Sequence, residues 1–239
     1  MKTAVCFTGQ CRSLEFTHES IKENLLNCFE DCDVFMYVSD NEDAFKAEKY
    51  MTPTEMRIEP DIPIDEININ HQQAIERGGL QGYLQMLHGL KKCNEMRVRY
   101  EEQHGIKYDR IIRSRLDIKF FKPVSEHIKD LDLNYLYIPD FHCWDIVQGA
   151  GYNDRFAISN RTNMNIYLNE VDFIRKYSLQ GFKIHAESTL CTHLKSHGIK
   201  VKTLPIRFTR VRKGGVEEDN YIAKDPATWP QGEGCACAI

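Results

Sequence analysis

One acidic residue stands among arginines near the middle of the chain. Arg113, Arg115 and Asp117 belong to the run Tyr-Asp-Arg-Ile-Ile-Arg-Ser-Arg-Leu-Asp at residues 108–117, which is typical of a buried strand. A carboxylate at the tip of such a strand costs stability unless a positive group meets it. A divalent metal that carries a nucleotide-sugar diphosphate would meet that need, and so would an ion pair with Arg113 or Arg115. Spacing alone leaves both interpretations open.

A glycine and a cation follow the first expected strand. Gly9 comes directly after Thr8, and its missing side chain lets a ligand approach the backbone. Arg12 stands just before an expected helix, where a cation can meet phosphate. An ordinary turn between a strand and a helix explains the same residues. The chain has neither a dinucleotide-binding Gly-x-Gly-x-x-Gly nor a phosphate loop ending in Gly-Lys-Ser/Thr at this place, so both common nucleotide motifs are excluded here.

Strand-like and helix-like segments alternate along the chain. The expected strands are residues 4–8, 33–38, 56–58, 110–117, 135–139, 155–159 and 199–204, and the expected helices are residues 13–32, 82–100, 162–177 and 186–197. This alternation predicts an α/β fold with a mainly parallel central sheet flanked by helices. Ligands of such sheets gather at the carboxyl ends of the strands. Gly9, Asp40 and Asp117 are all expected at those ends.

Bulk properties narrow the class of protein. A chain of 239 residues with 42% apolar residues suits one globular domain. The net charge of −4 gives no overall electrostatic footprint for nucleic acid. We find no secretory signal and no apolar run of about 18 residues, so we expect no transmembrane segment and a cytoplasmic location. The nine cysteines lack paired zinc-binding spacing and are expected to be reduced.

Five short motifs are spread along the chain. They are Phe-Thr-Gly-Gln-Cys-Arg-Ser at residues 7–13, Asp-Val-Phe-Met-Tyr-Val at residues 33–38, the run at residues 108–117, Asn-Asp-Arg-Phe-Ala-Ile-Ser at residues 153–159 and His-Ala-Glu-Ser-Thr-Leu-Cys-Thr-His-Leu at residues 185–194. Together they resemble a group of glycosyltransferase-like proteins of the GT-A fold found in algae, microbes and large DNA viruses. The resemblance covers about residues 2–204. It implies a single Rossmann-like GT-A catalytic domain at residues 1–205, followed by a basic loop and flexible tail at residues 206–239.

The resemblance implies transfer of a sugar from a nucleotide-diphospho-sugar, most simply UDP-linked, to a glycan or protein-glycan acceptor. GT-A enzymes hold Mn²⁺ or Mg²⁺ against the donor diphosphate with an Asp-x-Asp motif at a strand end. The matching segment here is Arg115-Leu116-Asp117, so only the second acid is present. Asp117 is therefore the expected metal ligand, while Arg115 could itself offset phosphate charge. Either cation would stabilise the leaving group, where negative charge develops in the transition state.

Further residues are assigned to the donor and acceptor sides by the same resemblance. Thr8, Gly9, Arg12, Arg113 and Arg115 are expected around the donor, and Asp40 is expected to reach the ribose or base.

On the acceptor side, Glu187 is the first candidate for the base that deprotonates the acceptor hydroxyl, and Asp154 is the second. Glu187 is equally explained as an acid that favours a helix N-terminus. A basic cluster of Arg207, Arg210, Arg212 and Lys213 either closes over a diphosphate or forms a solvated tail.

Two other classes of protein remain open on the sequence alone. A binding module could keep the fold and a nucleotide or glycan pocket without turnover, and the missing first acid of Asp-x-Asp favours it. A nucleotidyltransferase that acts on sugar phosphates shares the sheet architecture. It usually carries a glycine-rich basic signature after the first strand, and this chain lacks one.

Overall fold

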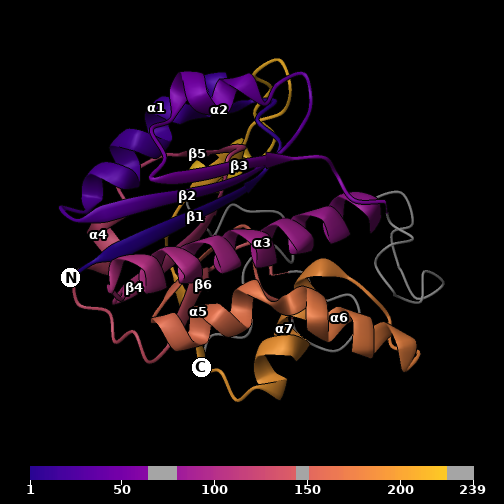
Figure 1. The fold of residues 1–239 in the computed structure, drawn as a ribbon. Coiled ribbons are helices and arrows are strands. Elements are labelled where there is room, and N and C mark those ends of the chain that lie inside the picture. Colours follow the sequence, from indigo (N-terminus) through magenta and orange to yellow (C-terminus); the bar gives the residue numbers. More distant parts are fainter. Residues whose placement is uncertain (64–79, 144–150, 225–239) are drawn as a thin grey trace.

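The central sheet has seven strands in the order β3-β2-β1-β4-β7-β6-β8 (Figure 1). The computed structural model describes residues 1–63, 80–143 and 151–224. The strands are β1 (Thr3–Gly9), β2 (Cys32–Ser39), β3 (Glu55–Glu59), β4 (Arg110–Arg115), β6 (Leu136–Pro139), β7 (Phe156–Ser159) and β8 (Val201–Leu204). The first four in sequence run parallel, and β7 is antiparallel to both of its neighbours. The predicted α/β fold with a mainly parallel sheet is confirmed.

Helices cover both faces of this sheet. They are α1 (Leu14–Asn24), α2 (Phe45–Tyr50), α3 (Leu80–His104), α4 (Ser125–Ile128), α5 (Arg161–Leu168), α6 (Glu170–Leu179) and α7 (Ala186–Ser196), with 3₁₀ turns η1 (Leu26–Cys28) and η5 (Asn220–Ala223). Figure 1 shows α1 and α2 on one face and α3, α5, α6 and α7 on the other. Alternate strand residues enter opposite cores, so Val5 and Phe7 pack with α1 while Ala4 and Cys6 pack with α3.

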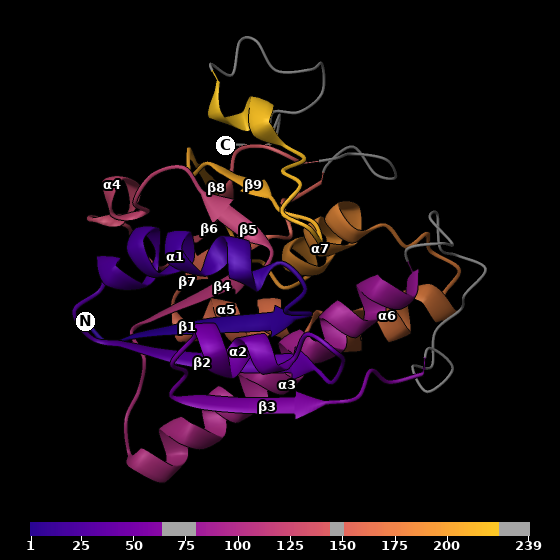
Figure 2. The same cartoon turned by 90° about the horizontal axis from the view of Figure 1, so that it is seen from above.

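A second sheet of two strands lies beside α1 (Figure 2). It pairs β5 (Ile118–Phe120) with β9 (Phe208–Arg210) in antiparallel fashion. Phe208 and Ile222 are fully buried in the core on the α1 face of the central sheet. The chain from residue 206 to residue 224 is therefore packed into the domain rather than forming a loop beyond a boundary at residue 205. The rest of the expected tail, residues 225–239, lies outside the described residues.

Two of the expected helices differ from the observed ones. The expected helix at residues 162–177 is two helices, α5 and α6, because the chain leaves helical geometry at Asn169. Asn160 caps α5 by accepting a hydrogen bond from the Asn163 backbone N–H. The expected helix at residues 13–32 ends at Asn24 and continues only as the short η1 turn. Apolar residues keep a helical spacing across both breaks. This spacing alone therefore does not show where the backbone leaves the helix.

Among the cysteines of the described residues, six are free thiols, as expected. Cys143 is disulfide-bonded, so the expectation of reduced thiols is wrong for that residue. Within residues 1–63, 80–143 and 151–224, no helix is both long and apolar enough to cross a membrane.

The end of β1 depends on a glycine with a left-handed backbone. Gly9 has φ +116°, a region that other residues avoid, although a Cβ there would meet no atom within 4 Å. Gly9→Ala should therefore cost about 1 kcal/mol through backbone strain alone. Gly82 is the matched control, because it lies in α3 with equally open space and no positive φ. Gly82→Ala should stabilise by about 0.5–1 kcal/mol, and urea unfolding effects of the same sign at both glycines would contradict this account.

Candidate functional site

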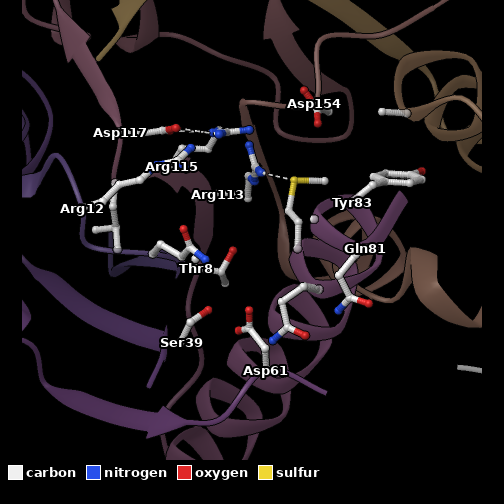
Figure 3. Close-up of a pocket in the computed structure, with 17 residues that line it drawn as sticks. Thr8, Arg12, Ser39, Asp61, Gln81, Tyr83, Arg113, Arg115, Asp117 and Asp154 are labelled. Carbon is white, nitrogen blue, oxygen red and sulfur yellow. Dashed lines mark hydrogen bonds and ion pairs between the residues drawn. The ribbon is translucent and has the colours of Figure 1, made fainter. Parts of the chain in front are cut away.

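A pocket of about 440 Å³ opens at the carboxyl ends of β1, β2 and β4 (Figure 3). The first turn of α3 and the start of α7 complete its wall. This volume lies within the usual range of small-molecule sites. Seven of the expected site residues line it: Thr8, Gly9, Arg12, Arg113, Arg115, Asp117 and Asp154. The structure therefore brings together residues that are more than 140 positions apart in the sequence.

Arg113 is a fully buried cation at the pocket wall. Its position on β4 is fixed between β1 and β7, opposite Cys6 and Ala157. The side chain is 0% exposed, and its Nη2 donates only to the Met86 sulfur at 3.2 Å. Nε and Nη1 are buried and have no hydrogen-bond partner among the described residues. Burial lowers the pKa of Arg113, as is expected for a charge without a close counter-ion.

Arg115 and Asp117 form a two-point ion pair. Arg115 Nε donates to Asp117 Oδ1 and Nη2 donates to Oδ2, both at 2.6 Å (Figure 3). Burial alone would raise the pKa of Asp117, but the charge and hydrogen bonds of Arg115 outweigh it and lower the pKa to about 2. The backbone around Asp117 is also held, because Thr17 Oγ1 donates to the Leu116 carbonyl at 2.6 Å and the Val211 N–H to the Asp117 carbonyl at 2.7 Å. Of the two sequence interpretations of Asp117, the ion pair with Arg115 is what the structure contains.

The surroundings of Asp117 do not fit a divalent cation. Mg²⁺ and Mn²⁺ prefer several oxygen ligands, chiefly carboxylates. Both Asp117 oxygens accept from Arg115, and Arg12 and Arg210 add positive charge nearby. No group of three or more His, Cys, Asp or Glu side chains that could hold a metal occurs in the described parts of the chain. The metal role of Asp117 stays a prediction.

Two further groups on this wall are available to a ligand. Thr8 is 5% exposed, and its Oγ1 is buried without a hydrogen-bond partner in the described chain. Arg12 is half-buried, and its guanidinium makes no ion pair or hydrogen bond to any described residue. Only the backbone carbonyl of Arg12 accepts a hydrogen bond, from Lys46 Nζ. Ser39 at the end of β2 also lines the pocket. Buried polar groups are normally satisfied, so their orphaned atoms mark a place where a polar ligand fits.

The opposite wall carries acidic groups. Asp154 lies across the pocket from Arg12 (Figure 3), half-buried in the loop before β7. Tyr83 of α3 lines the pocket, and its hydroxyl donates to Glu170 Oε1 at 3.0 Å. Glu170 is 3% exposed; burial raises its pKa to about 8, and the negative charge of Asp154 adds to the effect. The sequence interpretation missed Tyr83 and Glu170, which are 87 residues apart and carry no motif.

Two expected site residues do not line the pocket. Asp40 follows β2 as expected, but it is exposed, and Ser39 with the exposed Asp61 lies at the pocket instead. Glu187 lies in the first turn of α7, where its Oε2 is 3.4 Å from His185 Nε2. Its neighbour Ala186 reaches the pocket wall. The role of Glu187 as an acceptor base stays a prediction.

The basic cluster near the chain end is paired with carboxylates. Arg207 binds Asp140 through two hydrogen bonds, and Lys213 Nζ lies 2.6 Å from Glu42 Oε1. The two remaining members, Arg210 and Arg212, share Glu218. None of these four cations lines the pocket.

The buried acid Glu170 predicts a pH dependence of stability. Its carboxyl binds a proton in the folded state up to pH of about 8 but releases it near pH 4.5 in the unfolded chain. Between these values the folded state holds more protons, so wild-type stability should fall as pH rises, by up to about 1.4 kcal/mol per unit. Glu170→Gln keeps an acceptor for Tyr83 and should flatten this slope in urea unfolding at pH 5–8. Asp172→Asn, a change at an exposed acid of α6, should leave the slope intact; an unchanged slope in Glu170→Gln would contradict the account.

The fold and pocket define an α/β protein with a pocket at the strand ends that Arg12, Arg113 and Arg115 line. The chain belongs to the family described as Domain of unknown function (DUF7796), whose model matches residues 1–215. No curated protein matches the sequence. One similar solved structure is the apo-form glycosyltransferase GlyE of Streptococcus pneumoniae TIGR4, with a TM-score of 0.42 and 13% identity, over 84% of this chain and 45% of GlyE. The matched part of this chain thus spans less than half the length of GlyE.

Proposed function

We propose that this protein is a glycosyltransferase that moves a sugar from a nucleotide-diphospho-sugar, UDP-linked in the simplest case, to a glycan or protein-glycan acceptor. The observation that carries the proposal is Arg113, a fully buried guanidinium at the pocket wall with two unpartnered nitrogens. A buried charge without a counter-ion is costly, and an anionic ligand removes that cost. Phosphate oxygens match the planar fork of a guanidinium.

The two walls of the pocket suit the two halves of glycosyl transfer. The leaving nucleoside diphosphate gains negative charge as the sugar becomes oxocarbenium-like, and Arg12 and Arg113 lie where such charge would be stabilised. The acceptor hydroxyl must lose a proton, and Asp154 on the facing wall is a carboxylate within the same pocket. Asp154 is therefore the proposed base, with Glu187 next to the pocket as the alternative.

Thr8, Gly9 and Ser39 border the proposed donor at the ends of β1 and β2. The left-handed backbone at residue 9 favours glycine, so no side chain projects from this edge. The Thr8 hydroxyl offers an unpartnered buried polar group. Ligands of open parallel sheets bind outside the carboxyl ends of the strands, which is where these residues lie. The nucleoside half of the donor is assigned to this edge, and the sugar to the side of Tyr83 and Asp154.

A binding module without turnover is the second candidate. The observation that favours it is the Arg115–Asp117 ion pair, which occupies the one acid that matches an Asp-x-Asp motif. Such a module would bind a nucleotide in the same pocket and leave its sugar bond intact.

Turnover of a panel of donors separates the two candidates. UDP-, GDP- and dTDP-sugars are incubated with the protein, with Mn²⁺ and with chelator, and nucleoside diphosphate release is measured. Release from one donor, reduced at least tenfold in Asp154→Asn with nucleotide binding retained, is the expected result. Binding without release from any donor, even with added glycan acceptors, would favour the binding module, and no binding of any donor would contradict both.

A further inference from the structure

We propose that this site meets the diphosphate charge with fixed arginine side chains and no divalent ion, and that Asp117 is a positioning residue for Arg115 rather than a metal ligand. The inference rests on the proposed function, because it assigns the chemistry of the donor subsite. It departs from what the sequence resemblance implies, and it stands on the contacts of Arg113, Arg115, Asp117 and Arg12.

The Asp117 carboxylate is already used. Each of its oxygens accepts a 2.6 Å hydrogen bond from Arg115, and the Asp117 side chain is 8% exposed. A metal at Asp117 would have to displace a guanidinium that is itself largely buried, and would then lie next to that displaced charge. Two like charges in a poorly solvated site repel each other strongly. The Arg115–Asp117 ion pair therefore competes with metal binding at Asp117.

Asp117 leaves one face of Arg115 for the ligand. The ion pair uses Nε and Nη2 of Arg115, and Nη1 makes no hydrogen bond to the described residues. Arg115 lines the pocket, so Nη1 is the atom that remains for a phosphate oxygen. The two-point contact fixes the plane of the guanidinium, and the backbone of Asp117 is in turn held by Val211. Prior fixing of a donor reduces the ordering cost when the anion binds.

Arg113 is the second arginine that we assign to the diphosphate. Its β4 position is locked by pairing with β1 and β7, and its only hydrogen bond is to the Met86 thioether, a weak acceptor. Its other two nitrogens, Nε and Nη1, are buried and have no acceptor among the described residues. Figure 3 shows Arg113 and Arg115 side by side at the pocket wall.

The charges on this wall match a diphosphate. Arg12, Arg113 and Arg115 against Asp117 leave two positive charges, and the diphosphate of a nucleotide sugar carries two negative charges. Burying Arg113 without a protein counter-ion costs free energy, and a bound anionic ligand would offset that cost.

Calorimetric titration tests the inference with UDP and with inorganic pyrophosphate as probes, each in chelator and in Mn²⁺. We expect wild type to bind UDP in chelator, with less than a threefold change in Kd when Mn²⁺ is supplied. Arg113→Gln should weaken UDP at least tenfold, since a hydrogen bond to a charged group is lost. Arg113→Met is the second variant in case Arg113→Gln does not fold. Arg212→Gln, an arginine outside the pocket, should bind as wild type does.

Asp117→Asn separates positioning from metal binding. A positioning role predicts weaker UDP binding by the same factor in chelator and in Mn²⁺, because Arg115 loses its anchor in both. UDP binding that requires Mn²⁺ and is lost only in that arm of Asp117→Asn would overturn the inference and leave the proposed function standing. Pyrophosphate binding at Arg113 without any UDP binding would overturn the proposed function and leave the arginine site for phosphate groups standing. No binding of either probe would overturn both.

Discussion

Arg113→Met should make the ligand-free protein more stable and remove the stabilisation that UDP gives to the wild type. The Arg113 side chain is fully buried, and its one hydrogen bond is to a thioether. The cost of removing its charge from water is therefore not offset by any contact within the described chain. Replacing even a buried ion pair with apolar side chains of similar volume is often stabilising, by about 1–4 kcal/mol, and Arg113 has no close counter-ion to lose. Thermal and urea unfolding, with and without UDP, measure both effects.

Arg97→Met is the matched control for that prediction. Arg97 is also 0% exposed, but its guanidinium binds Glu101 and the side chains of Asn94 and Asn165. Its removal leaves the buried Glu101 short of a partner, so a loss of about 3–5 kcal/mol is expected. Opposite signs at two equally buried arginines would show that Arg113 is kept for a ligand. Similar losses at both would mean that Arg113 is an ordinary structural residue.

Asp117→Asn should destabilise the protein at neutral pH by about 2 kcal/mol. The pKa of this carboxyl is about 2 in the folded state against 3.8 for the ordinary group, so ionisation favours the folded state. A lowered pKa gives stability that is present above pH of about 4 and is lost as pH falls through 2. The difference between wild type and variant should therefore shrink on acidification, in urea unfolding followed from pH 7 to pH 2.5.

Arg115→Gln and the double variant complete this test. If the ion pair carries the effect, the two single losses should not add in the double variant, because either change alone breaks the same contact. A difference between wild type and Asp117→Asn that stays constant with pH, or losses that add, would contradict the pair as the source of stability.

The arginine-lined wall of the pocket, proposed to hold the donor, was largely predictable because its residues lie at strand ends. Gly9 follows an apolar run, and Arg113 and Arg115 fall two apart on a strand, so they share one face of the sheet. The partner of Asp117 was not predictable from spacing, because the answer depends on how the chain turns after β4. Strand direction was equally hidden, since nothing local to β7 specifies that it runs antiparallel to β4.

The facing wall could not be predicted because its contacts are long-range. Tyr83 and Glu170 meet only when the first turn of α3 packs beside the start of α6. The break at Asn169 that places Glu170 at a helix start interrupts a pattern that reads as one continuous helix. Asp61 reaches the pocket from the proline-containing connection after β3, where the sequence predicts neither a strand nor a helix.

A crystal structure of the protein with UDP in the presence of chelator tests the central claim most directly. We expect a phosphate oxygen within about 3 Å of Arg113 Nε or Nη1, with the Arg115–Asp117 pair intact beside it. UDP bound elsewhere, or UDP in the pocket with no phosphate oxygen at Arg113 Nε or Nη1, would contradict the account.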